Sequence, residues 1–162
     1  MTRGEHSPTE AAGGRGLKKV SRRAARRRAL EILYEADIKD RGLCDVLDLH
    51  LRGDDPPPEF TVELVSGVDA HRAELDEIIR SHAHSWRLER MPVIDRNLLR
   101  MGLHESLHRP DIPVAVAIDE AVELAKEFST DDSARFVNGV LARAIRRPDT
   151  GPLEGRYERD AQ

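Results

Sequence analysis

Seven basic side chains stand within eleven residues near the start of the sequence, and no acidic residue interrupts them before Glu31. Cationic groups at this density repel one another, and a polyanionic partner such as RNA or DNA would offset that repulsion. The alternative is a solvated charged face, or a basic tail without a fixed ligand. The seven residues are Lys18, Lys19, Arg22, Arg23, Arg26, Arg27 and Arg28.

Two aromatic side chains could add base stacking to these phosphate contacts. A single RNA strand is usually held by cations on its phosphates and by planar side chains on its splayed bases. Tyr34 follows the basic run, and Phe136 stands next to Arg135 further along the chain. One stacked ring contributes about 1–3 kcal/mol per base. Both rings could equally be core residues, so the pattern leaves the two roles open.

The sequence carries no group of residues typical of an enzyme. His82 and His84 are two apart, so on a helix they point in different directions and cannot share a metal ion. There is no HExxH, no phosphate-binding glycine loop and no Gly-x-Ser-x-Gly. The carboxylates of Asp119, Glu120 and Glu123 form an acidic helix face that is expected to be solvated. We therefore expect no catalytic residue, no cofactor and no metal.

A helix over residues 21–39 must position the basic groups. Ser21 can cap its start, and Gly42 can end it. Arg23 and Arg27 share one side, whereas Arg28 lies nearer the opposite, apolar side, so we expect Arg28 to pack or pair internally. The helix would thus show the core a small-residue stripe and the solvent a cationic one. The apolar stripe consists of Ala25, Ala29, Ile32 and Ala36, and the cationic side also includes Leu30 and Tyr34.

The whole chain predicts a compact all-α fold. Aromatic residues make up only 4% of it, which favours aliphatic helix packing over a β-sandwich. Trp86 is expected in the core, and Gly139 is expected to permit a close approach between helices. Residues 1–17 and 147–162 are polar tails that we expect to be disordered. About seven helices are predicted, over residues 21–39, 45–51, 59–70, 72–84, 93–107, 114–128 and 134–145, and the pattern leaves open whether 59–84 is one bent helix or two.

The charge is unevenly distributed. The net charge is −4, but residues 1–28 carry +7, which leaves −11 for the rest. This asymmetry suggests one surface for nucleic acid and another for a basic protein. Cys44 is the only cysteine, so a disulfide framework and a cysteine zinc site are excluded. No apolar run approaches membrane-spanning length and no signal-peptide core is present, so we expect a cytoplasmic protein without membrane contact.

Several motifs together resemble the NusB family. The stretch from Ile112 reads IPVAVAIDEAVELAKEFS and resembles that family's penultimate helix, and the stretch from Asp131 reads DDSARFVNGVL, its most recognisable signature. Upstream, VIDRNLLR from Val93 resembles the fifth helix, and the arginine-rich start ending in ALEILY resembles the first. The resemblance covers residues 18–146 in order. The chain departs from the usual pattern at Asn97 and Ser106.

The resemblance implies an all-helical, non-catalytic bundle of two subdomains, over about 18–70 and 71–146. Proteins of this family bind the boxA element of ribosomal RNA leader transcripts, pair with the ribosomal protein NusE, and help to load an antitermination complex onto RNA polymerase. It also places Asp132 and Asp95 near the NusE surface. A carboxylate just before or within the first turn of a helix has a structural explanation as well, because it suits the free N–H groups and the helix dipole.

Two other functions remain open at this point. NusB-like domains also precede the catalytic domain of some RNA cytosine methyltransferases. This hypothesis requires a catalytic domain with a cofactor-binding fold. A DNA-binding helical module could use the same basic helix in a major groove. A homodimer is also possible and could hide the arginine face until a partner opens it.

Overall fold

The computed structural model describes residues 20–145, which form seven α-helices and a short 3-10 helix, η1, with no strand. The predicted all-α class is confirmed. Lys18, Lys19 and both predicted tails lie outside the described residues. Within residues 20–145, no helix is long and apolar enough to cross a membrane. The elements are α1 (Arg22–Lys39), α2 (Leu43–Arg52), α3 (Glu59–Ala70), α4 (Arg72–His82), η1 (Leu88–Arg90), α5 (Val93–His108), α6 (Val114–Phe128) and α7 (Asp131–Ala144).

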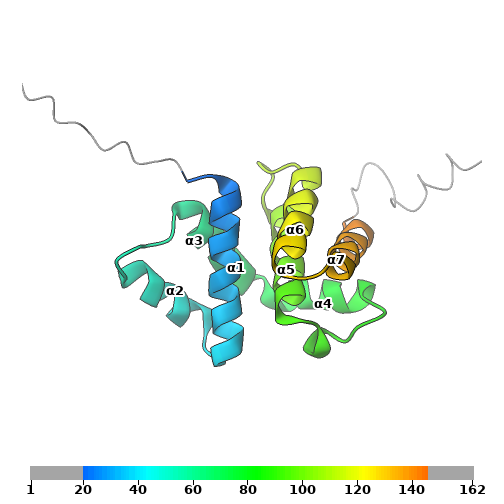
Figure 1. Ribbon diagram of the computed structural model, residues 1–162, viewed down its shortest axis with the longest axis horizontal. Coiled ribbons are helices and arrows are strands. Elements are labelled where there is room, and N and C mark those ends of the chain that lie inside the picture. The colour runs from blue at the N-terminus through cyan, green and yellow to red at the C-terminus, as the bar shows by residue number, and fades with distance from the viewer. Residues whose placement is uncertain (1–19, 146–162) are drawn as a thin grey trace, which may run out of the picture.

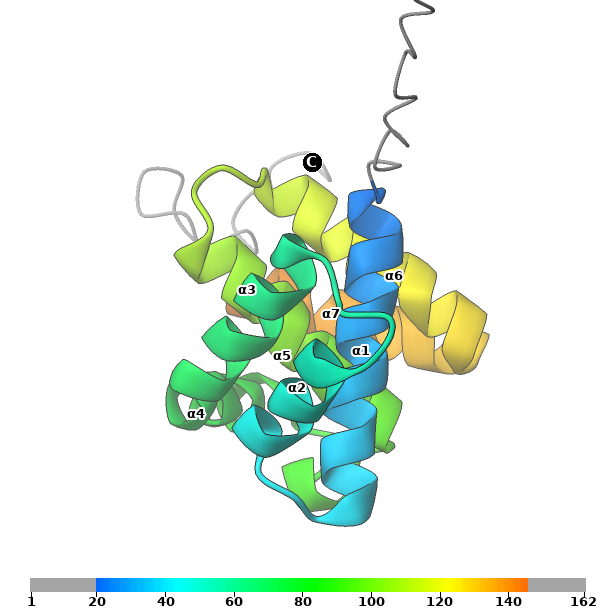
Figure 2. The same ribbon diagram turned by 90° about the vertical axis from the view of Figure 1, so that its left-hand side faces the viewer.

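Helix α5 is the centre of the molecule. It contacts α1, α3, α4, α6 and α7, and residues 97–105 are all buried. Figure 1 shows α2 and α3 on one side of α1 and the helices α4 to α7 on the other. The view from the side in Figure 2 places α2 and α3 in front of α5. Because α5 is covered on all sides, its polar residues must find partners inside the protein. These are Asn97, Arg100, His104 and Glu105.

The helix ends follow local capping rules. The Ser21 hydroxyl accepts a hydrogen bond of 3.1 Å from the Ala24 N–H at the start of α1, as predicted. The prediction that Gly42 ends α1 is wrong, because Asp40 adopts the left-handed conformation there, with φ of 49°. Thr130 caps α7 by accepting from the Ser133 N–H. A single residue, His71, separates α3 from α4.

The close approach expected at Gly139 occurs instead at Gly102, and a second one occurs at Gly67 of α3, where an added Cβ would overlap the His104 ring of α5. A Cβ added at Gly102 would lie 2.9 Å from a Leu141 methyl and 3.5 Å from the Ala121 Cβ, so this glycine lets α5 approach α6 and α7. A Cβ at Gly139 would meet only the Arg143 side chain, at 3.2 Å. That side chain is flexible and can move aside.

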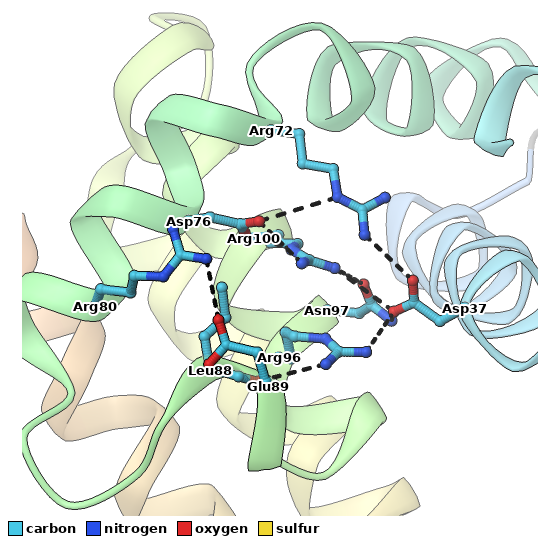
Figure 3. A network of polar contacts seen from close by, with 9 residues as sticks. All are labelled: Asp37, Arg72, Asp76, Arg80, Leu88, Glu89, Arg96, Asn97 and Arg100. Atoms are coloured by element: carbon cyan, nitrogen blue, oxygen red, sulfur yellow. Dashed lines mark hydrogen bonds and ion pairs between the residues drawn. The ribbon is translucent and has the colours of Figure 1, made fainter. Parts of the chain in front are cut away.

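A polar network joins α1 to α4 and α5, as Figure 3 shows. Asp37 of α1 accepts hydrogen bonds of 3.1 Å from Arg96 and 3.0 Å from Asn97, and lies 3.5 Å from Arg100. Arg100 in turn forms a bidentate ion pair with Asp76 of α4, with hydrogen bonds of 2.7 and 3.1 Å. The network crosses the predicted boundary near residue 70, and the division into two subdomains stays a prediction.

The prediction that Trp86 lies in the core is wrong. Trp86 follows the end of α4 and is 50% exposed, beside Arg80 and His84. Leu88 and Met91, which follow in the same connector, are buried instead. A large aromatic side chain in a connector therefore does not by itself indicate burial, because the backbone path of the connector determines where the side chain points.

Candidate nucleic-acid interface

The arginines of α1 do not all point the same way. Arg22 and Arg23 are exposed and Arg27 is half-buried, and these three lie near the N-terminal end of the helix. Leu30, which the sequence placed on the same cationic side, is buried. The reason is that α1 packs against α2 and α3 on one side and α5 on another, so more than one stripe of the helix is covered. The exposed cationic region is accordingly shorter than predicted.

Each of these three accessible arginines forms an ion pair with a carboxylate of the same chain. The Nε and Nη2 atoms of Arg23 each donate a hydrogen bond of 3.1 Å to Glu120, and Arg27 donates one of 3.0 Å to Glu127. Since Glu120 and Glu127 both lie on α6, this helix runs beside the N-terminal half of α1 (Figure 2). The hydrogen bond and charge of Arg23 lower the pKa of Glu120 below its ordinary value, although partial burial opposes the shift. Arg22 lies 3.6 Å from Asp111 in the loop before α6.

These ion pairs reduce the electrostatic repulsion among the arginines that the sequence indicated. The sequence suggested that a polyanionic partner would offset the repulsion within the basic cluster, but carboxylates of the protein itself supply much of the compensation. A nucleic acid would therefore have to compete with these carboxylates for the arginines. Exposed pairs of this kind contribute little to stability and are weakened by salt, so they can exchange partners.

Arg26 lies inside the protein and not on the candidate surface. Its guanidinium donates to Glu105 of α5 at 2.8 Å, and the two side chains are only 4% and 2% exposed. It also lies 5.1 Å above the ring of Phe60. The sequence grouped Arg26 with the RNA-binding residues because its charge is visible in a one-dimensional pattern, whereas the covering helices are not. Arg28 pairs with Asp55 at 3.1 Å, but the Asp55 side chain is 91% exposed, so this pair lies at the surface and not in the interior as expected.

Three adjoining hollows in the surface form a continuous path from the arginines of α1 to helix α7. The first lies between Arg27 and Lys126, the second between Arg23 and Asn138, and the third extends from Lys126 to Arg135. Cations of three helices line the path, and so do carboxylates, among which Glu123 pairs with Lys126 at 3.2 Å. The cations are Arg23, Arg27, Lys126 and Arg135, and the carboxylates are Asp119, Glu120, Glu123, Glu127 and Asp131. Sequence reasoning missed Lys126. Its outward phase on residues 114–128 was readable, but nothing in the sequence showed that α1 and α7 flank it.

The two aromatic candidates differ in exposure. Tyr34 is 42% exposed on α1, so one face of its ring is open to solvent. Phe136 is half-buried and packs against the core. Arg135 beside it is exposed and donates to Asp132 at 2.6 Å. Tyr34 is therefore the better placed of the two for stacking on a base.

The two acidic candidates also differ. Asp132 lies in the first turn of α7 with its side chain 90% exposed. Asp95 lies in the first turn of α5 and is only 3% exposed, and its Oδ1 has no hydrogen-bond partner among the described residues. The interior position of Asp95 arises because α5 is the central helix. Only Asp132 is thus presented to a partner on this surface.

Comparisons with known proteins agree with this architecture. The model of the NusB family matches residues 23–146. The transcription antitermination protein NusB of Saccharopolyspora erythraea is 53% identical over 126 residues, covering 76% of this chain and 85% of that protein. The protein of the same name from Kineococcus radiotolerans is 49% identical over 132 residues, covering 81% and 97%.

Solved structures show the same fold. The structure of T. maritima NusB superimposes with a TM-score of 0.70 at 29% identity, covering 86% of this chain and 99% of that one. A crystal structure of the antitermination factors NusB and NusE in complex with dsRNA gives a TM-score of 0.63 at 26% identity, covering 76% and 94%.

Proposed function

This chain belongs to the NusB family, and we propose on that basis that it is a non-catalytic transcription antitermination factor of the cytoplasm. It binds boxA-like single-stranded RNA of ribosomal RNA leader transcripts together with the ribosomal protein NusE, as part of the antitermination complex on RNA polymerase. One structural observation supports the RNA contact most directly. Exposed cations of α1, α6 and α7 border the three adjoining hollows described above.

The proposed RNA path begins at Arg22, Arg23 and Arg27 and continues past Lys126 to Arg135. Phosphates contact these cations, and the ring of Tyr34 stacks on a base. Lys18 and Lys19 precede the described residues and extend the basic stretch in the sequence. Arg26 contributes by supporting α1 from inside. Phe136 is assigned a packing role beside Arg135. Asp132 is proposed to contact NusE, and Asp95 to support the start of α5 behind that contact.

Replacing Arg23 and Arg27 together by alanine is expected to weaken RNA binding by about tenfold or more, because two phosphate contacts are lost. The log–log salt slope should also become less steep by about 1.4, since each phosphate contact on a single strand contributes about 0.7. Fluorescence anisotropy with a labelled boxA-like strand measures both quantities.

A matched control for this double change is Arg80→Ala with Arg90→Ala. It removes the same charge from α4 and η1, where both residues are exposed. Binding should then change little. If the two double variants bound RNA equally well, the α1 surface would not be the RNA site. Circular dichroism and thermal unfolding should show both variants folded, because none of the four side chains is buried.

Removing the carboxylates that pair with Arg23 and Arg27 is expected to raise the RNA affinity. Replacing Glu120 and Glu127 together by glutamine is expected to strengthen RNA binding severalfold, because Arg23 and Arg27 no longer have to leave an ion pair and two negative charges are removed from the path. The matched control is Glu59→Gln with Glu77→Gln, which makes the same charge change on α3 and α4. Equal gains in both variants would indicate a general charge effect in place of local competition.

A further inference from the structure

Three side chains from separate parts of the fold bring metal-ligating atoms together on the side of α5 that α3 and α4 cover. His71 stands between α3 and α4, Glu74 lies in the first turn of α4, and His108 is the last residue of α5. One ligand atom from each lies within 4.8 Å of the other two. Two imidazole nitrogens and a carboxylate oxygen are a ligand set that Zn²⁺ commonly accepts.

The protonation of the two rings suits a metal. The Nδ1 atom of His71 lies 3.0 Å from the Gly67 carbonyl oxygen, which can only accept, so Nδ1 carries the proton and Nε2 has the lone pair. A backbone carbonyl that orients the other ring nitrogen is typical of metal-ligating histidines. The Nε2 atom of His108 is buried and makes no hydrogen bond within residues 20–145. Glu74 Oε2 lies within ion-pair distance of this atom but does not meet hydrogen-bond geometry.

The distance between two of the three ligand atoms matches that of a tetrahedral ion. His108 Nε2 lies 3.3 Å from Glu74 Oε2. Two ligands at about 2.0–2.1 Å from Zn²⁺ in tetrahedral geometry are about 3.3 Å apart. The His71 and His108 rings stack with centroids 3.8 Å apart and planes inclined by 11°. Because a bound ion lies in the plane of each imidazole, the His108 ring must turn about its Cβ–Cγ bond when the ion enters, while the Gly67 carbonyl holds the His71 ring. The half-exposed Glu74 carboxylate leaves an open side for a water ligand.

The surroundings do not oppose a cation. The His104 ring stacks 5.5 Å from both rings. Arg109 is the nearby positive charge, and carboxylates compensate it. Its guanidinium donates to Asp111 at 3.0 and 3.1 Å and to Glu63 at 2.9 Å.

We propose that His71, Glu74 and His108 form a Zn²⁺ site that ties the corner between α3 and α4 to the C-terminal end of α5. The ion joins three elements that otherwise meet here through stacked rings and a single carboxylate contact. Binding stabilises the folded protein by mass action, and it requires neutral imidazoles.

The test is a titration of the untagged full chain with ZnCl₂ at pH 7.5, followed by calorimetry and by thermal unfolding. We expect one saturable site, and an increase in Tm of about 5 °C or more when Zn²⁺ is present at one hundred times its Kd. Glu74→Gln and His108→Gln should each weaken binding by at least about tenfold. His84→Gln, which removes an exposed histidine outside the cluster, is the matched control and should bind as the wild type does.

Glu74 is exposed, so Glu74→Gln is expected to fold even if His108→Gln does not. In the wild-type protein, Zn²⁺ should shift the ring resonances of His71 and His108 in NMR spectra and leave that of His84 unchanged. The proposal is overturned if no saturable binding occurs, if His84→Gln weakens binding as much as Glu74→Gln does, or if the His71 and His108 resonances do not move.

Discussion

Replacing Glu105 by alanine is expected to lower the free energy of unfolding by about 3–5 kcal/mol, because it leaves the Arg26 guanidinium buried without its carboxylate. The two groups are 2.8 Å apart, and neither side chain is more than 4% exposed. Burial raises the pKa of Glu105 above its ordinary value even though Arg26 opposes the shift. The intact pair therefore contributes little net stability, and the expected loss comes mainly from breaking it.

Urea unfolding at pH 7 measures this loss, with Glu127→Ala as the matched control. Glu127 also pairs with an arginine of α1, at 3.0 Å, but both side chains are substantially exposed, so the control should lose less than about 1 kcal/mol. A double change, Arg26→Met with Glu105→Leu, should recover most of the stability because no charge is left buried. Equal losses for Glu105→Ala and Glu127→Ala would show that Arg26 is not held inside as described.

Replacing Asp37 by alanine is the second large change, and we expect it to cost about 3 kcal/mol or more. The variant leaves Arg96 and Arg100 of the central helix without a shared carboxylate, and it removes the acceptor of the Asn97 amide. Burial by itself raises the pKa of Asp37, but the hydrogen bonds from Asn97 and Arg96 and the charge of Arg100 outweigh it, so the pKa lies below its ordinary value.

The lowered pKa determines how this loss depends on pH. A carboxyl group whose pKa is lower in the folded state stabilises the protein fully above its unfolded pKa of about 3.9, and the contribution is lost as the pH falls below that value. The difference in unfolding free energy between wild type and Asp37→Ala should therefore be constant between pH 7 and about pH 5 and shrink in more acidic buffer. Asp119→Ala, an exposed change on α6, serves as the control. A difference that persists unchanged at pH 3 would argue against a role for the Asp37 charge.

Periodicity was enough to predict the helices of this protein. The prediction for residues 59–70 agrees with α3, and that for 21–39 agrees with α1 once Ser21 is counted as its cap. The apolar spacing of i, i+4 and i+7 is a local property, so a single sequence contains it. The exposed position of Asp132 was likewise compatible with local patterns.

The site itself was less predictable, because burial of a polar residue depends on segments that are distant in sequence. Arg26 and Glu105 are separated by 79 residues, and only the packing of α1 on α5 makes them partners. The ion pairs between α1 and α6 and the position of Lys126 depend on the same packing. The cluster of His71, Glu74 and His108 is invisible in the sequence for this reason too. Charge and spacing identified the residue types, and the tertiary structure decided which of them reach the surface.

The most direct test of the proposed function is fluorescence anisotropy of the full chain with a labelled boxA-like RNA strand, with and without NusE, across a salt series. NusE should tighten binding, and the single strand should bind more tightly than duplex DNA of the same length. With about four to six phosphates contacted, the log–log salt slope should be about −3 to −4. Binding that is indifferent to NusE and to the type of strand would contradict the account and leave only a non-specific basic surface.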